Sequence, residues 1–327
     1  MTTTSTKLMR PLKIGVVGAT GMVGKSFIEI LTERKFPVAH LAPFASDASV
    51  GKTISLQSKQ YPIQSLKQGC FDGLDLVFFS SGDDISREWA AQAVKAGAWA
   101  VDNSAAFRAD ARFHLVVPEV NGDLLEESKT PSIIANPNCS TIQLVVALKP
   151  LLENFGLEKV QVASYQAVSG AGQQAHDDLM ARSRTDDCCV PEIGSFDAIG
   201  FTSEENKIMT ETKKILRASS LKVSAFTVRV PVLNAHAEAV WVTLAKEVSR
   251  EQVLSSLEKM PGLKLQTELK DYVTQRESSG TDPVYVGRVH QDQTDSKTWI
   301  MWVVADNIRK GAALNGIQIA ERLFQAK

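Results

Sequence analysis

A cysteine in a tight polar turn is the residue of this sequence best suited to covalent chemistry. Cys139 follows residues 136–138, Asn-Pro-Asn, a run typical of a tight turn, and precedes a helical pattern. The start of a helix stabilises a thiolate and offers backbone N–H groups to a developing oxyanion. A buried structural cysteine is the alternative interpretation. The flanking turn favours Cys139 as a nucleophile.

A histidine and an arginine near one strand end could act with such a thiol. Arg229 lies two residues before Pro231 at the end of a predicted strand, and His236 follows that strand. Strand ends often carry site residues, and arginine suits two-pronged recognition of a carboxylate. A structural histidine and a surface ion pair are the simpler interpretations, and both stay open on these residues alone.

Two other segments carry less chemistry. Cys188 and Cys189 are adjacent and have no CxxC partner pair, which argues against a zinc site and favours packing or loop residues. Residues 169–172, Ser-Gly-Ala-Gly, form a glycine-rich turn that does not match the serine-hydrolase motif. A flexible loop without a ligand is the simpler interpretation of that turn.

The N-terminal part contains the pattern of a dinucleotide site. Residues 13–17 form a short apolar run that predicts a buried strand, and a helical pattern follows residue 22. Between them, Gly18, Gly21 and Gly24 allow a tight turn and close approach of a pyrophosphate to the backbone. The helix start adds N–H groups and the positive end of a dipole.

The remaining pattern indicates two domains of different architecture. Strands and helices alternate up to about residue 139, as in a doubly wound parallel sheet of the Rossmann type. Strand-like runs dominate afterwards and predict a second α+β domain with a mixed or antiparallel sheet. The predicted strands are 13–17, 38–44, 74–79, 98–101 and 132–135, then 160–168, 223–230, 239–245 and 299–305. The predicted helices are 85–96, 140–148, which should end at Pro150, and an amphipathic helix at 309–324.

Length and composition are those of an ordinary globular protein. The chain has 327 residues, 44% hydrophobic and 22% charged, and a formal net charge of −1. Scattered basic residues argue against a nucleic-acid partner, and no apolar run is long enough to span a membrane. Residues 1–10 are expected to be a polar tail, and four cysteines in so long a chain indicate reduced thiols in the cytoplasm.

Several motifs together resemble the aspartate-β-semialdehyde dehydrogenase family. The ordered set covers almost the whole chain and is far more specific than a dinucleotide fingerprint. Its members are residues 18–24, 102–108, 117–121, 136–143, 165–172, 204–207, 211–216, 228–232 with His236, and 306–312.

The resemblance implies an NADP-dependent reductive dephosphorylation of β-aspartyl phosphate to aspartate β-semialdehyde, and its reverse, through a cysteine thioester. This is a step in the biosynthesis of lysine, threonine, methionine and diaminopimelate. It also implies a homodimer or a dimer of dimers, inorganic phosphate as co-substrate, and no metal. The dinucleotide-binding domain is expected at 1–139, with a C-terminal helix at 309–327 returning to it, and the catalytic and dimerisation domain at 140–308.

The resemblance assigns a role to each matching residue. Cys139 would be the nucleophile, His236 the acid/base that takes the hydroxyl proton, and Gln166 would orient the substrate. The substrate contacts would be Arg229 to the carboxylate, Glu204 to the amino group, and Arg108, Lys207 and Asn103 to phosphate. The cofactor would contact Gly18, Thr20, Gly21, Met22, Val23, Ser46, Ser49, Ser81, Gly82, Ser169, Gly170 and Asn307.

One loop departs from the family pattern. Related sequences often carry a basic residue that meets the adenosine 2′-phosphate, where this chain has Ala48 with Asp47 beside it. An acid there favours a ribose hydroxyl, so NAD stays possible beside NADP. The segment 184–200 matches no family pattern.

Two rival interpretations remain. N-acetyl-glutamyl-phosphate reductase resembles this family in fold and mechanism but has a different cysteine turn. A non-catalytic paralogue that keeps the fold would be expected to lose Cys139, His236 or Arg229, and all three are present.

Overall fold

The computed structural model describes residues 10–181 and 188–325. The chain divides into two compact units, one of residues 1–137 with 312–327 and one of residues 138–311. The expected polar tail at 1–10 lies outside the described residues except for Arg10, whose guanidinium binds Asp75 at 2.6 Å.

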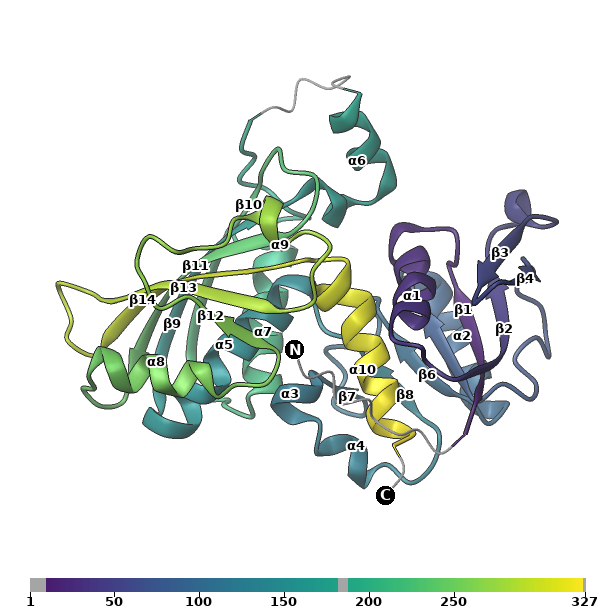
Figure 1. Ribbon diagram of the computed structural model, residues 1–327, viewed down its shortest axis with the longest axis horizontal. Coiled ribbons are helices and arrows are strands. Elements are labelled where there is room, and N and C mark those ends of the chain that lie inside the picture. Colours follow the sequence, from purple (N-terminus) through teal and green to yellow (C-terminus); the bar gives the residue numbers. More distant parts are fainter. Residues whose placement is uncertain (1–9, 182–187, 326–327) are drawn as a thin grey trace. The chain divides into compact units, whose positions relative to one another are not determined.

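The first unit is built on a six-stranded sheet in which every neighbouring pair runs parallel (Figure 1). In spatial order the strands are β2 (Val38–Phe44), β1 (Leu12–Val17), β5 (Leu76–Phe79), β6 (Trp99–Asp102), β8 (Ile133–Ala135) and β7 (His114–Leu115). All residues of β5, β6 and β8 are buried. Continuous apolar strands of this kind are typical of a parallel sheet that is covered on both faces.

Helices cover both faces of this sheet. Phe78 packs in one core cluster together with residues of α1 (Met22–Glu33) and α10 (Leu314–Leu323). The next residue, Phe79, points to the other face and packs with α2 (Asp83–Lys95). The predicted doubly wound fold class is confirmed. The smaller elements are η1 (Asp47–Ser49), the hairpin of β3 (Thr53–Leu56) and β4 (Lys59–Pro62), α3 (Pro118–Asn121) and α4 (Leu124–Glu127).

The second unit is built on a six-stranded mixed sheet, as predicted. In spatial order its strands are β10 (Lys222–Arg229), β9 (Leu157–Gln166), β11 (His236–Leu244), β14 (Thr298–Ala305), β13 (Val284–Gln291) and β12 (Leu263–Leu265). The pairs β10/β9 and β12/β13 are parallel and the three central pairs are antiparallel.

Three helices pack against the mixed sheet, and two of them also pack against the third. The central helix α5 (Cys139–Phe155) contacts β9, β11, β13 and β14. Its neighbours are α7 (Ser203–Ile215), which contacts β10, and α8 (Arg250–Glu258), which contacts β12 and β13. The shorter elements are η2 (Val168–Ala171), α6 (Gln173–Met180), α9 (Gln275–Ser278) and the π-helical turn η3 (Arg309–Ala313), which precedes α10.

The predicted end of α5 at Pro150 is wrong, because the helix continues to Phe155. Proline in a helix interior removes one backbone hydrogen bond and costs about 3 kcal/mol. Almost every residue from 140 to 151 is buried, and each buried aliphatic side chain contributes about 1.5–3 kcal/mol. The Pro150 carbonyl also accepts hydrogen bonds from Asn154 Nδ2 and Ser256 Oγ. Tertiary packing therefore outweighs the local preference.

Two further differences concern segments near the site. His236 was expected to follow a strand, whereas it is the first residue of β11. No helix was predicted for residues 203–215, which form α7. Among the described residues, none of the helices has the length and apolar character needed to cross a bilayer.

Candidate active site

Three strands of the mixed sheet carry a band of polar side chains where their ends meet. Arg229 of β10 pairs in register with Gln166 of β9, and Ser164 of β9 pairs with Glu238 of β11. Paired residues share a sheet face, and so do residues two apart on one strand. His236 is two residues from Glu238 and therefore lies on the same face as the others. The predicted carboxylate clamp, Gln166 and the predicted acid/base thus come together.

Cys139 begins the helix that packs on this sheet. The side-chain oxygen of Asn138 caps α5 by accepting hydrogen bonds from the backbone N–H groups of Ser140 (2.9 Å) and Thr141 (3.2 Å). The N–H of Asn138 donates to Glu211 Oε2 at 2.7 Å. These three amides already have acceptors, so the prediction that amides of this turn receive the oxyanion is wrong for them.

The chain passes very close to Cys139 a second time, at Gly311. A Cβ at Gly311 would lie 2.9 Å from the Cβ of Cys139 and 3.3 Å from its Cα. The N–H of Gly311 donates to the carbonyl of Asp306 at 2.9 Å, which holds this segment in place. Only glycine allows this approach, and Cys139 itself is half-buried.

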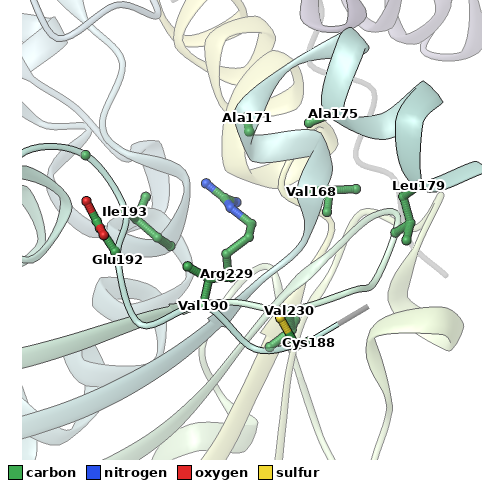
Figure 2. A pocket seen from close by; sticks show the side chains of 11 residues that line it. Val168, Ala171, Ala175, Leu179, Cys188, Val190, Glu192, Ile193, Arg229 and Val230 are labelled. Atoms are coloured by element: carbon green, nitrogen blue, oxygen red, sulfur yellow. The ribbon is translucent and has the colours of Figure 1, made fainter. Parts of the chain in front are cut away.

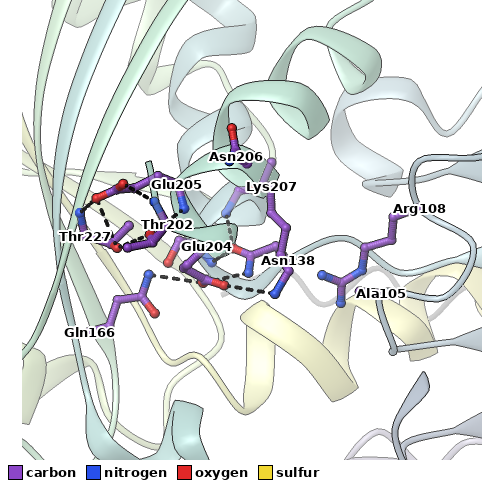
Figure 3. Close-up of polar contacts among 12 residues, drawn as sticks. Ala105, Arg108, Asn138, Gln166, Thr202, Glu204, Glu205, Asn206, Lys207 and Thr227 are labelled. Carbon is purple, nitrogen blue, oxygen red and sulfur yellow. Dashed lines mark hydrogen bonds and ion pairs between the residues drawn. The ribbon is translucent and has the colours of Figure 1, made fainter. Parts of the chain in front are cut away.

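Glu204 lies at the centre of a polar network that includes Asn138, the residue before Cys139 (Figure 3). Its Oε1 accepts hydrogen bonds from Asn138 Nδ2 at 2.8 Å and from Gln166 Nε2 at 3.2 Å. Its Oε2 forms an ion pair with Lys207 Nζ at 3.3 Å. Burial by itself would raise the pKa of the Glu204 carboxyl, but Lys207 and the two amides outweigh it and lower the pKa. Glu204 is therefore a buried carboxylate.

The Arg229 guanidinium links the network to the cysteine. Burial lowers its pKa, whereas the negative charges of Cys139 and Glu204 act to raise it. Nη1 donates to the carbonyl of Ala167, and the side chain lines a cavity of about 300 Å³ (Figure 2). The cavity walls are mainly apolar, with Cys188 among them. A planar cation in this position can bind a carboxylate.

His236 is completely buried and is held in one ring orientation. The backbone N–H of Ala167 donates to its Nδ1 at 3.1 Å. Burial, and then the charge of Arg229, lower the pKa of His236 to about 3. The ring is therefore neutral at pH 7, and since Nδ1 accepts a hydrogen bond, the proton is assigned to Nε2. Nε2 accordingly faces the site as a donor.

Asn307 fixes the two loops that flank His236. Its Oδ1 accepts a hydrogen bond from the N–H of Ala235 at 2.8 Å, and its Nδ2 donates to Ser169 Oγ at 3.0 Å. A Cβ at Gly170 would lie 2.8 Å from Arg229 Nη1 and 3.1 Å from His236 Nε2. The glycine-rich turn is thus the 3₁₀ helix η2 packed on the site residues rather than a flexible loop.

Arg108 and Asn103, the other predicted phosphate residues, contact each other within the first unit. Arg108 is buried, and its Nη2 donates to the backbone carbonyl of Asn103 at 2.8 Å. The side chain of Asn103 accepts a hydrogen bond from Asn136 Nδ2 at 2.7 Å. Asn136 is also bonded to the Ala312 carbonyl and to Asn315, so the segment before Pro137 is fixed by its own unit.

Those predicted nucleotide residues that belong to the first unit lie at one edge of the parallel sheet. The turns after β1, β2 and β5 contain Gly18 to Val23, Ser46 and Ser49, and Ser81 with Gly82. Gly18 has φ +82°, and a Cβ at Gly24 would lie 2.1 Å from the Gly18 carbonyl oxygen. No side chain caps α1, so its first N–H groups face a turn without side-chain bulk. This cradle fits a pyrophosphate.

Several residues that support the site were not predicted from the sequence. Asn138 was assigned only to a turn, although an asparagine directly before a helical pattern is a capping signal. Thr202 and Glu205 form a capping box that starts α7, and the spacing Thr-x-x-Glu could have located this helix. Glu211 and Gly311 stood within family motifs without an assigned role, and no local pattern indicated Glu238.

Both units match described families. Residues 13–128 match the semialdehyde dehydrogenase NAD binding domain, and residues 148–310 match the semialdehyde dehydrogenase dimerisation domain. The chain is therefore a two-domain oxidoreductase with a dinucleotide-binding unit. It belongs to the aspartate-semialdehyde dehydrogenase family.

Full-length relatives support this assignment. The aspartate-semialdehyde dehydrogenase of Aquifex aeolicus is 42% identical over 335 residues, covering 96% of this chain and 98% of the relative. The structure of aspartate semialdehyde dehydrogenase II from Vibrio cholerae complexed with ASA has a TM-score of 0.92 at 40% identity, covering 96% and 98% of the two chains. The enzyme from Candida albicans with NADP has a TM-score of 0.78 at 29% identity, covering 96% and 99%.

Proposed function

We propose that this protein reduces β-aspartyl phosphate to aspartate β-semialdehyde with NADPH, and catalyses the reverse reaction, through a thioester on Cys139. The observation that carries the proposal is the meeting of Cys139, Arg229, Glu204 and His236 at one end of the mixed sheet. A nucleophile, a carboxylate-binding cation, an anion for an ammonium group and a hydrogen-bond donor are the groups that an amino-acid aldehyde requires.

The reaction in the oxidative direction begins at the Cys139 sulfur. The thiolate attacks the aldehyde carbon, and the oxygen that becomes negative receives a hydrogen bond from His236 Nε2–H. The expected role of His236 as a proton acceptor is thereby changed to that of a donor, because Nδ1 is occupied by the Ala167 amide. The C–H bond of this adduct then breaks with loss of hydride, for which bound NADP would be the acceptor, and a thioester is left. A phosphate oxygen attacks the thioester carbon and expels the thiolate. Lys207 and Arg108 bind this phosphate.

The nicotinamide supplies hydride acceptance and hydride donation when it is bound. The glycine turn after β1 and the start of α1 would hold its pyrophosphate. Ser46 and Ser49, which flank Asp47 in the turn after β2, would meet the adenosine ribose. Asn307 and Ser169, which bond to each other, would lie near the nicotinamide.

The same proposal includes a homodimer formed through the open face of the mixed sheet. Phe226 is 56% exposed, and Tyr165, Trp241 and Trp302 on this face are only half-buried. Exposed aromatic side chains in one patch are typical of an interface. The proposal also includes the cytoplasmic location and the biosynthetic role expected from the sequence.

A direct assay tests the reaction. Aspartate semialdehyde, phosphate and NADP should together yield NADPH, and omission of phosphate should stop steady turnover. N-acetyl-glutamyl semialdehyde serves as the control substrate and should be much poorer. The absence of phosphate-dependent turnover, or a preference for the acetylated aldehyde, would reject the proposed function.

Arg229→Lys is expected to lower kcat/KM for aspartate semialdehyde. The decrease should correspond to a loss of about 1–3 kcal/mol in transition-state binding. Lysine keeps the charge but cannot present two parallel N–H groups to a carboxylate. The comparison is with an aldehyde that lacks the carboxylate, on which the substitution should have little effect. An equal loss on both aldehydes would indicate a structural role for Arg229.

Neutralising Lys207 or Arg108 as methionine is expected to raise KM for phosphate about tenfold or more and KM for the aldehyde much less. The reason is that each cation is proposed to bind the phosphate. Lys213→Met on the same helix as Lys207, and Arg112→Met close to Arg108, are the matched controls. A larger rise in the aldehyde KM than in the phosphate KM would contradict the assignment.

Asp47→Ala is expected to raise the ratio of kcat/KM for NADP over NAD, roughly fivefold, because it removes a negative charge from the 2′-phosphate side. The carboxylate accepts a hydrogen bond from Ser65 Oγ at 2.6 Å, which holds it in this turn. The wild type should prefer NADP modestly, and the exposed Asp72→Ala should leave the ratio unchanged. An unchanged ratio in Asp47→Ala would remove Asp47 from cofactor choice.

A further inference from the structure

A buried carboxyl that the reaction does not use lies directly behind the site. Glu238 has no exposed area and lies two residues after His236 on β11. Its neighbours across the sheet are Ser164 on β9 and Val303 on β14. Burial raises the pKa of Glu238 well above its usual range, so the side chain is a neutral acid.

The polar group that acts on this acid belongs to the helix of the nucleophile. Gln143 of α5 is 1% exposed, and its amide interacts with the Glu238 carboxyl. Within the described residues, neither the amide atoms of Gln143 nor the carboxyl oxygens of Glu238 form a hydrogen bond with any residue, although α5 packs directly on β11. Gln143 is four residues after Cys139, so both point to the same side of α5, one turn apart.

The two side chains match as hydrogen-bonding partners. A neutral carboxyl has one donor and one acceptor, and a primary amide offers both as well. An ionised carboxylate could only accept and would leave the Gln143 oxygen without a donor. Buried polar groups in proteins are nearly always paired, since unpaired ones are costly.

We propose that Glu238 and Gln143 form an acid–amide pair that fixes α5 against β11 and thereby positions Cys139 relative to His236. The pair joins the helix that carries the thiol to the strand that carries the imidazole. Gln143 lies one helical turn after Cys139, and Glu238 lies two residues after His236. This inference rests on the proposed function, because it assumes that Cys139 and His236 act on one substrate. Glu238 and Gln143 are then positioning residues.

The test compares Glu238→Met, Gln143→Met and the double variant with the wild type. Each single substitution should lower kcat about tenfold and change KM for aldehyde and cofactor little, because misplacement of reacting groups affects the chemical step. The double variant should be no worse than either single variant, since both remove the same pair. Glu238→Gln, which can still pair with an amide, should recover most of the kcat lost in Glu238→Met.

Val242→Ala, farther along β11, is the matched control. It removes buried volume and should lower the melting temperature without lowering kcat. If Glu238→Met does not fold, Gln143→Met carries the test. Additive losses in the double variant, unchanged kcat in Gln143→Met, or a Glu238→Gln variant as slow as Glu238→Met would overturn the proposal.

A failure of the proposed function would look different. The wild type itself would then not turn over aspartate semialdehyde. The rate of Cys139 alkylation by iodoacetamide does not depend on that substrate, and it should still differ between the wild type and Gln143→Met. Equal alkylation rates in these two proteins would count against the pair alone.

Discussion

The Cys139→Ala variant is expected to lose turnover by at least about 10⁴-fold, because no other group can form the covalent intermediate. The substitution removes only the sulfur and keeps the Cβ, which lies next to Gly311. A Cβ added to that glycine would be 2.9 Å away. The fold and cofactor affinity should therefore be unchanged. Turnover under saturating substrates and cofactor titration by fluorescence measure the two quantities.

The other cysteines provide matched controls for this variant. Cys70 is half-buried in the first unit, and Cys188 is exposed in the second. Cys70→Ala and Cys188→Ala should keep nearly full activity and should not prevent alkylation of Cys139. Near-wild-type turnover of Cys139→Ala would refute covalent catalysis at this residue.

His236→Asn is expected to lower kcat by about 10²–10³-fold, the usual effect of removing one donor to an oxyanion. KM should change little, because the hydrogen bond strengthens only as charge develops on the substrate oxygen. His176→Asn serves as the control. His176 lies on α6, where its Nδ1 is 3.4 Å from Asp177 Oδ1. An unchanged kcat in His236→Asn would remove His236 from the chemical step.

The pH profile separates a donor from a base at His236. Its pKa is lowered to about 3, below the ordinary value of 6.5, so the ring stays neutral as pH falls from 6.5 toward 3. The wild-type kcat should therefore show no loss of activity that is centred near pH 6.5 and caused by His236. The donor assignment would be contradicted if the wild-type kcat fell as the pH dropped through about 6.5 and this fall disappeared in His236→Asn.

Local patterns predicted the first unit well because its elements follow short-range rules. The apolar run at β1, the glycine turn and the helix after it are each recognisable within a few residues. β2 was predicted at 38–44 and observed at Val38–Phe44. The continuation of α5 beyond Pro150 was not predictable, since it depends on burial against strands that are far away in sequence.

The site also contains residues that local patterns could predict and residues that they could not. Cys139 could be inferred from its turn and helix, and the roles of Arg229, Glu204 and His236 came from the resemblance. The hydrogen bond from Ala167 to His236 depends on two strands meeting across 69 residues, so the tautomer could not be predicted. Glu238 looked like an ordinary polar residue of a strand, and only the packing of α5 identifies it as buried.

The most direct test of covalent catalysis is mass spectrometry of the protein after mixing with aspartate semialdehyde and NADP in the absence of phosphate. We expect an added aspartyl group on the peptide that contains Cys139, and its release as β-aspartyl phosphate when phosphate is supplied. The Cys139→Ala protein should acquire no such group. An active wild type that never carries the acyl group on Cys139, or that carries it on another residue, would contradict the account.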